Sequence, residues 1–250
     1  MPKAGAITGK NGMGDRMKRE DYIQKILQNY QLVTVLSSKN GGKVLHLRNK
    51  NLQKDLVLRS YPQAIEAYRK LLNVRTSALP EVYDVTDLED GQIVLEEFIS
   101  GLSAAQVMET GKYRPTGVKR VMRALCRGMS VLHELEIIHR DIKPENLMIT
   151  PNGRVALIDL NASRHLSAAN KDTVIMGTVG YASPEQLGIT QSDARTDIYA
   201  AGVLLNVMLT GVHPSQKLAS GHYGRIIRKC TAINPDDRFQ SAKNLEKALW

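Results

Sequence analysis

The spacing of apolar residues changes once along this chain, near Gly101, and this change constrains the fold. Before that point, short apolar runs separated by Gly, Asn and Asp read as strands, at residues 32–36, 44–48, 56–59, 82–85 and 93–97. Beyond it, apolar residues recur at intervals of three and four over 118–132, which predicts a long core-facing helix. The order predicts an α+β chain with a small strand-rich lobe, a larger helical lobe and a ligand cleft between them.

Two further elements refine this division. A helix is predicted over residues 62–73, because Pro62 suits a first helical position. A β-hairpin is predicted over 146–158, where Asn152-Gly153 supplies the positive φ angles of a tight turn. Residues 1–20 are polar and rich in Gly, so we expect them to form a disordered basic tail. The two lobes are then expected at 21–97 and 98–250.

The composition excludes several classes of protein. The 250 residues carry 34 Lys and Arg against 25 Asp and Glu, and the net charge of +9 favours anionic partners in general. Nucleic acid is not an expected partner, because no nucleic-acid-binding motif accompanies the charge. No apolar stretch approaches the roughly 20 residues of a membrane span, and the N-terminus lacks a secretory signal. These features predict a cytoplasmic chain, or the cytoplasmic part of a longer protein.

The two cysteines point to no metal site and no disulfide. Cys126 and Cys230 lie far apart, without the spacing of a zinc site or a disulfide framework. We expect both to be buried thiols.

A run of ionisable residues lies between the long helix and the hairpin: His139-Arg140-Asp141-Ile142-Lys143-Pro144-Glu145-Asn146. Eighteen residues after Asp141, Asp159 ends the apolar run 155–158, so its carboxylate is expected to face the same loop. Two carboxylates and an amide oxygen suit phosphoryl transfer. In that reaction one aspartate orients or deprotonates a hydroxyl, while the other groups hold Mg²⁺ on the phosphates.

This run resembles the catalytic loop of serine/threonine protein kinases, His-Arg-Asp-x-Lys-Pro-x-Asn, and the later aspartate resembles that of the Asp-Phe-Gly motif. The resemblance extends over about residues 30–249. It implies a bilobal protein kinase-like fold, with a small antiparallel-sheet N-lobe and a mainly helical C-lobe. It also implies that Asp141 is the catalytic base, that Lys143 stabilises charge, and that Asn146 and Asp159 are metal ligands.

Later segments carry the same resemblance. Residues 177–185 resemble the end of a kinase activation segment, which implies that Thr178 helps to seat the substrate hydroxyl. Glu185 would form a buried ion pair with Arg238. Asp197 and Gly202 would lie on the family's central buried helix, where the aspartate hydrogen-bonds the backbone of the catalytic loop.

Arg140 directly precedes Asp141 and needs an anionic partner. In the family an activation-segment phosphate supplies it, and Thr173 is favoured here over Ser167 and Thr178. Neutralisation of Arg140 by a carboxylate is the alternative.

The nucleotide-binding half departs from the kinase pattern at its glycine-rich loop. Gly42 and Val44 stay in register, but Ser37 and Lys39 replace two of the three glycines. Glycine there lets backbone amides approach the phosphates. The charge of Lys39 would offset the lost access.

Arg59 stands where the family has the strand lysine that binds the α- and β-phosphates. Arginine keeps the charge, but its planar fork is longer and bulkier than an ammonium group. The expected helix partner of Arg59 is Glu66. Lys39 or Lys43 is the alternative phosphate contact.

A further departure concerns the turn after Asp159, while the hinge is the expected site of adenine. Leu160-Asn161 replaces Phe-Gly, and Asn161 would occupy the left-handed backbone region that the glycine normally takes. The adenine of ATP is expected against the hinge at Glu96 to Phe98, behind Leu95 as the gatekeeper residue.

The sequence thus predicts an ATP- and Mg²⁺-dependent serine/threonine protein kinase, with Mn²⁺ as an alternative ion. It would phosphorylate protein substrates and, through a homodimer, its own activation segment. Two alternatives stay open. One is a pseudokinase that binds nucleotide or serves as a scaffold. The other is a kinase-fold enzyme that acts on small molecules, against which Thr178 and Ser183-Pro184-Glu185 argue.

Overall fold

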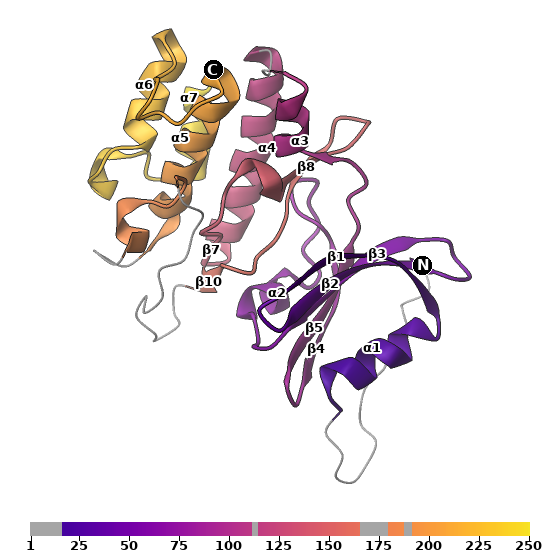
Figure 1. Ribbon diagram of the computed structural model, residues 1–250. Coiled ribbons are helices and arrows are strands. Elements are labelled where there is room, and N and C mark those ends of the chain that lie inside the picture. The colour runs from indigo at the N-terminus through magenta and orange to yellow at the C-terminus, as the bar shows by residue number, and fades with distance from the viewer. Residues whose placement is uncertain (1–16, 112–114, 166–179, 188–191) are drawn as a thin grey trace.

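The computed structural model describes residues 17–111, 115–165, 180–187 and 192–250. A five-stranded sheet with two helices forms one lobe, and a group of helices forms the other (Figure 1). The predicted α+β architecture and the order of its lobes are confirmed.

The N-lobe sheet is antiparallel and has the order β1-β2-β3-β5-β4. Its strands are β1 (Tyr30–Lys39), β2 (Gly42–Asn49), β3 (Asp55–Tyr61), β4 (Val82–Leu88) and β5 (Gly91–Glu97). Each contains one of the predicted strands. The predicted helix over 62–73 is shorter in the structure, where α2 spans Glu66–Leu71.

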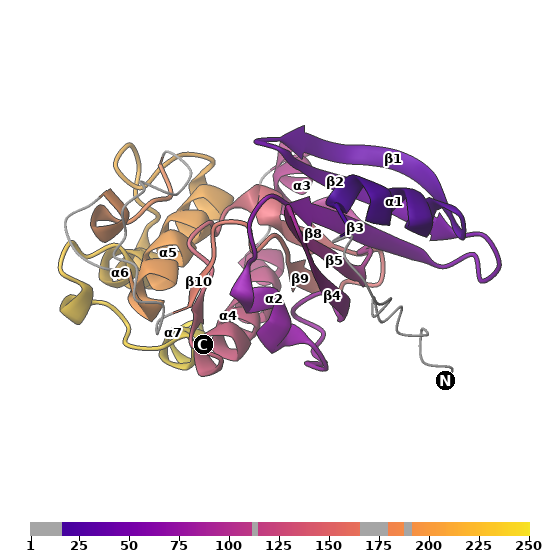
Figure 2. The same cartoon turned by 90° about the horizontal axis from the view of Figure 1, so that it is seen from below.

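Helix α1 (Arg19–Leu27) covers the face of the sheet that lies away from the helical lobe (Figure 2). Tyr22, Ile23 and Ile26 are buried there against apolar side chains of β2, β3 and β5. The prediction of a tail up to residue 20 is therefore wrong at its end, because residues 19 and 20 belong to α1. The three buried residues of this helix, at positions 22, 23 and 26, form one apolar stripe along it.

The C-lobe is mainly helical. Its elements are β6 (Leu102–Ser103), α3 (Ala104–Glu109), α4 (Pro115–Glu134), β7 (Ile137–Ile138), β8 (Leu147–Ile149), β9 (Val155–Leu157), β10 (Arg164–His165), α5 (Ala194–Thr210), α6 (Gly221–Cys230) and α7 (Ala242–Ala248). Short 3₁₀ turns span Pro144–Asn146, Pro184–Leu187 and Pro235–Asp237. Helix α5 lies between α4 and α6 (Figure 1).

The long helix and the hairpin predicted from the sequence are both present. The apolar residues of α4 that recur at intervals of three and four, from Val118 to Leu132, are fully buried in the main core. Strands β8 and β9 pair as a hairpin, in which Gly153 has φ 84°. Asn152 does not share the positive φ that the sequence predicted, so the glycine alone takes the left-handed position.

One arginine joins the hairpin to the hinge between the lobes. Arg154 binds both carboxylate oxygens of Glu97, at 2.5 and 2.9 Å, and donates to the carbonyls of Ser77 and Leu79. Bidentate pairs of this kind fix geometry as well as supplying energy. Arg154 therefore joins the hairpin of β8 and β9 to the end of β5 and to the segment that precedes β4.

Both cysteines are buried thiols, as the sequence predicted. Cys126 on α4 and Cys230 at the end of α6 are free and fully buried. Burial raises the pKa of each thiol above its ordinary value.

Among the described residues, none of the helices combines the length and apolar character of a membrane span.

Helices α5 and α6 pack so closely at Gly202 that a larger residue should not fit. A Cβ atom at this position would lie 2.2 Å from Cys230 Cβ. Gly202→Ala should therefore destabilise the chain by about 1–3 kcal/mol, because overpacking forces the two helices apart. Denaturant unfolding followed by circular dichroism measures this loss.

The double variant Gly202→Ala/Cys230→Gly supplies the control for that experiment. It removes the Cys230 side chain that the new methyl group would meet, so its destabilisation should be smaller than the sum of the two single losses. Strict additivity would show that the contact does not limit packing.

Candidate active site

The loop of residues 139–146 is anchored by a buried carboxylate on α5. Asp197 accepts hydrogen bonds from the backbone N–H groups of His139 and Arg140, both at 2.9 Å, and lies 2.8 Å from His133 Nε2. Burial alone would raise the pKa of Asp197, but these donors outweigh burial and hold the pKa below its usual value. This contact agrees with the role that the sequence analysis assigned to Asp197.

The loop brings together Asp141, Lys143 and Asn146. Lys143 Nζ lies 2.7 Å from Asp141 Oδ2, and Asn146 Nδ2 donates to the same oxygen at 3.0 Å. Asn146 also donates to the Asp141 carbonyl at 2.8 Å. The Asp141 carboxylate is therefore held in one orientation, half-buried, with a cation beside it.

The donor set fits a hard divalent cation. Within the described part of the chain, the Asn146 side chain forms its hydrogen bonds through Nδ2, which leaves Oδ1 available as an oxygen ligand. Asp159 follows Ile158, whose N–H donates to the Asn146 carbonyl at 2.8 Å, so both residues adjoin the same backbone contact. Carboxylate and amide oxygens are ligands that Mg²⁺ accepts.

Asp159, and not Asn161, adopts the left-handed conformation in this turn. Asp159 has φ 68°, whereas Asn161 is absent from the positive-φ residues of the described chain. The expectation for Asn161 is therefore wrong. The Asp159 carboxylate accepts from the Asn161 N–H at 3.3 Å, a local bond of the kind that lets aspartate tolerate this region.

Arg59 is held by Glu96 and not by Glu66. Arg59 Nε lies 2.6 Å from Glu96 Oε1, and Arg59 Nη1 lies 3.2 Å from Asp159 Oδ1. Burial alone would lower the pKa of Arg59, but the Glu96 carboxylate raises it above its usual value, so the guanidinium stays charged. The predicted pair with Glu66 is wrong, because that side chain is 60 % exposed and its nearest cation is Arg69, at 3.8 Å.

The hinge residues predicted to contact adenine fall into three environments. Leu95 packs with the cluster under α1, on the opposite face of the sheet from Glu96, so its expected gatekeeper position is wrong. Side chains alternate between the two faces of a strand, which places neighbouring residues on opposite sides. Glu96 faces Arg59, and the ring of Phe98 stacks on His46 with 3.8 Å between centroids.

The segment compared with a glycine-rich loop is a tight β-hairpin. Strand β1 continues to Lys39, β2 begins at Gly42, and Asn40 and Gly41 form a two-residue turn with φ 52° and 72°. Asn-Gly is the preferred sequence for such turns. Lys39 is exposed beside this turn, while Ser37 and Val44 are half-buried.

Gly42 and Lys43 have partners within the N-lobe. A Cβ atom on Gly42 would lie 2.9 Å from the Ser60 carbonyl, so the glycine allows β2 to approach the end of β3. Lys43 Nζ lies 2.6 Å from Glu20 Oε2 on α1. This salt bridge directs Lys43 towards α1.

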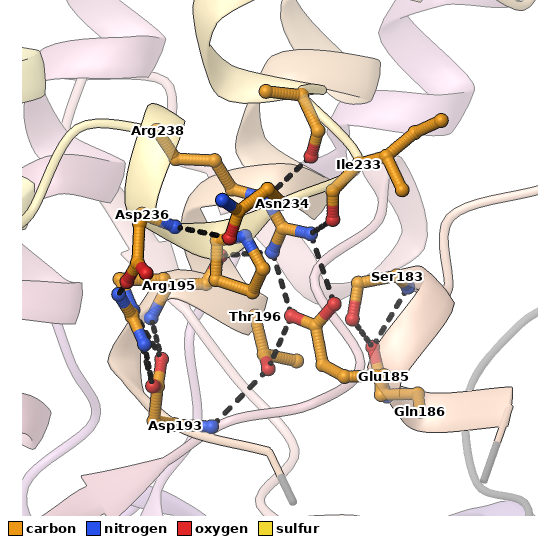
Figure 3. Close-up of polar contacts among 12 residues, drawn as sticks. Ser183, Glu185, Gln186, Asp193, Arg195, Thr196, Ile233, Asn234, Asp236 and Arg238 are labelled. Carbon is orange, nitrogen blue, oxygen red and sulfur yellow. Dashed lines mark hydrogen bonds and ion pairs between the residues drawn. The ribbon is translucent and has the colours of Figure 1, made fainter. Parts of the chain in front are cut away.

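A buried ion pair lies beside Thr196 at the start of α5 (Figure 3). Arg238 donates to both carboxylate oxygens of Glu185, at 2.6 and 2.9 Å, and Thr196 donates to the same carboxylate at 3.0 Å. Burial raises the pKa of Glu185, but the Arg238 guanidinium and other donors hold it below the usual value. The expected pair is present.

Neighbouring contacts link this ion pair to the catalytic loop. Gln186 Nε2 donates to the Arg140 carbonyl at 2.8 Å, so the end of the activation segment contacts the loop directly. Thr178, Thr173 and Ser167 lie outside the described residues.

The chain is similar in sequence to one known family and to curated proteins. A family model described as "Protein kinase domain" matches residues 33–249. Serine/threonine-protein kinase PknL of Mycobacterium tuberculosis is 36 % identical over 202 residues, which cover 70 % of this chain and 50 % of PknL. Serine/threonine-protein kinase PknB of Mycolicibacterium smegmatis is 28 % identical over 204 residues, which cover 69 % of this chain and 33 % of PknB. The chain thus spans half or less of the length of these curated relatives.

Breaking the buried pair should cost far more than breaking the exposed one beside it. Arg238→Ala should destabilise the chain by about 3–5 kcal/mol, because it leaves the Glu185 carboxylate buried without a cation. Arg195→Ala is the matched control, since Arg195 pairs with the half-buried Asp193 and the exposed Asp236, nearer the surface than the Glu185 pair (Figure 3). Its ion pairs should contribute about 0–1 kcal/mol. Equal losses of unfolding free energy in urea would contradict this assignment.

Proposed function

The chain belongs to the protein kinase family, and from this premise we propose that it is an ATP- and Mg²⁺-dependent serine/threonine protein kinase of bacterial type. The observation that carries the proposal is the ordered group of Asp141, Lys143 and Asn146 on a loop anchored by Asp197. The names of the curated relatives support the choice of serine and threonine as acceptors.

The chemistry follows from the positions of these side chains. The Asp141 carboxylate accepts the proton of the substrate hydroxyl as the hydroxyl oxygen attacks the γ-phosphorus, and the bond from that phosphorus to the β,γ-bridging oxygen breaks to release ADP. Lys143, 2.7 Å from Asp141 Oδ2, offsets the negative charge that develops at the transferred group. Asn146 Oδ1 and Asp159 would hold Mg²⁺, which supplies neutralisation of the phosphate charge when bound. In this proposal Thr178 seats the substrate hydroxyl.

Nucleotide would bind between the lobes, with its phosphates near Arg59 and its adenine near the hinge. Arg59 is the cation that the structure holds beside Asp159, at 3.2 Å. Val44, Gly42 and Ser37 lie on the hairpin formed by β1 and β2. We place the domain in the cytoplasm, where ATP is available, and propose that autophosphorylation proceeds between two copies of the chain.

A specific contact favours the second candidate, a pseudokinase. Arg59 occupies one oxygen of Asp159, the proposed metal ligand. If this contact persisted with nucleotide, the carboxylate would bind metal poorly, and the domain would act as a nucleotide-binding or scaffolding module. Transfer of phosphate distinguishes the two candidates.

Asp141→Asn should abolish phosphoryl transfer while the fold and nucleotide binding remain. The amide keeps the shape of the side chain but cannot accept the proton, so the rate should fall by about 10²–10⁴-fold, the usual contribution of a positioned base. Incorporation of labelled phosphate from ATP into a generic protein substrate and into the chain itself measures this. EDTA should stop the reaction of the unaltered chain. Nucleotide binding without any incorporation would instead support the pseudokinase.

Arg59 should contribute more to nucleotide affinity than Lys39. Arg59→Met should raise the Kd for a non-hydrolysable ATP analogue by about tenfold or more, since a charge-assisted contact contributes about 1.5–3 kcal/mol. Lys39→Gln should change it by less than about threefold, because an exposed charge is screened by solvent and salt. Isothermal titration calorimetry measures both. A larger loss with Lys39→Gln would assign the phosphate contact to the hairpin.

A further inference from the structure

We propose that Glu96 on β5 is the residue that positions Arg59 for the nucleotide phosphates, so that this cation is held independently of helix α2. The inference rests on the proposed function, because it assumes that nucleotide binds beside Arg59.

The sheet register brings Arg59 and Glu96 together. In the antiparallel pair of β3 and β5, Arg59 lies opposite Val94, and Val57 lies opposite Glu96. Side chains two residues apart share a face of a strand, so Arg59 and Glu96 are diagonal neighbours on one face. Both are almost completely buried, at 6 % and 3 % exposure. The contact is therefore part of the sheet itself.

The pair fixes the direction of the guanidinium. Arg59 Nε donates to Glu96 Oε1 at 2.6 Å. At the other end of the guanidinium, Arg59 Nη1 lies 3.2 Å from Asp159 Oδ1. The Asp159 side chain is 35 % exposed, so this end adjoins the open part of the site. Anchoring one side of the planar fork pre-organises the remaining N–H groups, which lowers the entropy lost when they bind phosphate.

Helix α2 makes its inward contacts with apolar and hydroxyl groups. Tyr68 is 1 % exposed, and its hydroxyl lies 2.9 Å from that of Tyr61 and accepts from the Leu160 N–H at 3.4 Å. Glu66, at the first position of α2, is 60 % exposed and lies near Arg69. The helix thus contacts the turn after Asp159 through Tyr68 and makes no ion pair with Arg59.

A separation of roles follows. A displacement of α2 would alter the Tyr68–Leu160 contact and thereby the turn that carries Asp159. It would leave Arg59 bound to Glu96 within the sheet. Regulation through α2 would therefore act on metal binding and transfer, and the phosphate-binding cation would stay in place.

A matched pair of variants tests this assignment. Glu96→Gln and Glu66→Gln remove the same charge from β5 and from α2, and the Kd of the magnesium complex of a non-hydrolysable ATP analogue is measured by calorimetry. Glu96→Gln should raise the Kd by about tenfold, because Arg59 loses its fixed counter-charge. Glu66→Gln should change it by less than about twofold, as expected for an exposed pair. Melting temperatures verify that each variant is folded.

The background of Arg59→Met separates positioning from a general structural effect. If Glu96 acts through Arg59, adding Glu96→Gln to Arg59→Met should produce no further loss of affinity. A further tenfold loss would overturn the proposal, as would equal effects of Glu96→Gln and Glu66→Gln. Should Glu96→Gln fail to fold, Glu96→Asp keeps the charge on a shorter side chain and should give an intermediate loss. An unchanged Kd in Glu96→Asp would contradict the positioning role.

Measurements on the unaltered chain separate a failure of the role of Glu96 from a failure of the proposed function. Binding of the analogue by this chain, with no difference between the β5 and α2 variants, would overturn only the role of Glu96. Absence of binding by the unaltered chain would overturn both that role and the proposed function.

Discussion

The site depends on one buried carboxylate, that of Asp197. Its two hydrogen bonds to the N–H groups of His139 and Arg140 hold a loop in which Arg140 has φ 66°. A non-glycine residue in this region costs roughly 1–3 kcal/mol, which the surrounding contacts must offset. The next residue back along α5, Thr196, donates to Glu185. Two consecutive residues at the start of one helix therefore hold both the catalytic loop and the end of the activation segment.

Much of the fold could be predicted because its signals are local. The burial of α4 along its apolar positions and the five strands of the sheet follow from periodicity and turn residues. Helix α1 was not predicted, because it has only nine residues and adjoins a polar tail. The tight turn at Asn40-Gly41 joins two of the predicted strands, and Asn-Gly is the preferred sequence for such a hairpin.

The candidate site likewise has a part that could be predicted from local sequence and a part that could not. Asp141, Lys143 and Asn146 lie within six consecutive residues, so the sequence alone places them in one loop, and their grouping agrees with the prediction. The partner of Arg59 depends on the register between β3 and β5, and on which residues of α2 turn inward. Glu96 and Leu95 are adjacent in sequence yet lie on opposite faces of the sheet. The pairing of Arg59 with Glu66 assumed a longer helix than the six residues that form.

The two buried cysteines have a consequence for how the C-lobe opens. Cys126 lies on α4 and Cys230 at the end of α6, and neither exposes its sulfur in the folded chain. Thiol reagents attack the thiolate, which burial disfavours in both residues. Alkylation therefore requires the helices to separate first. The rate at which these sulfurs are alkylated therefore reports how often the helices of this lobe separate.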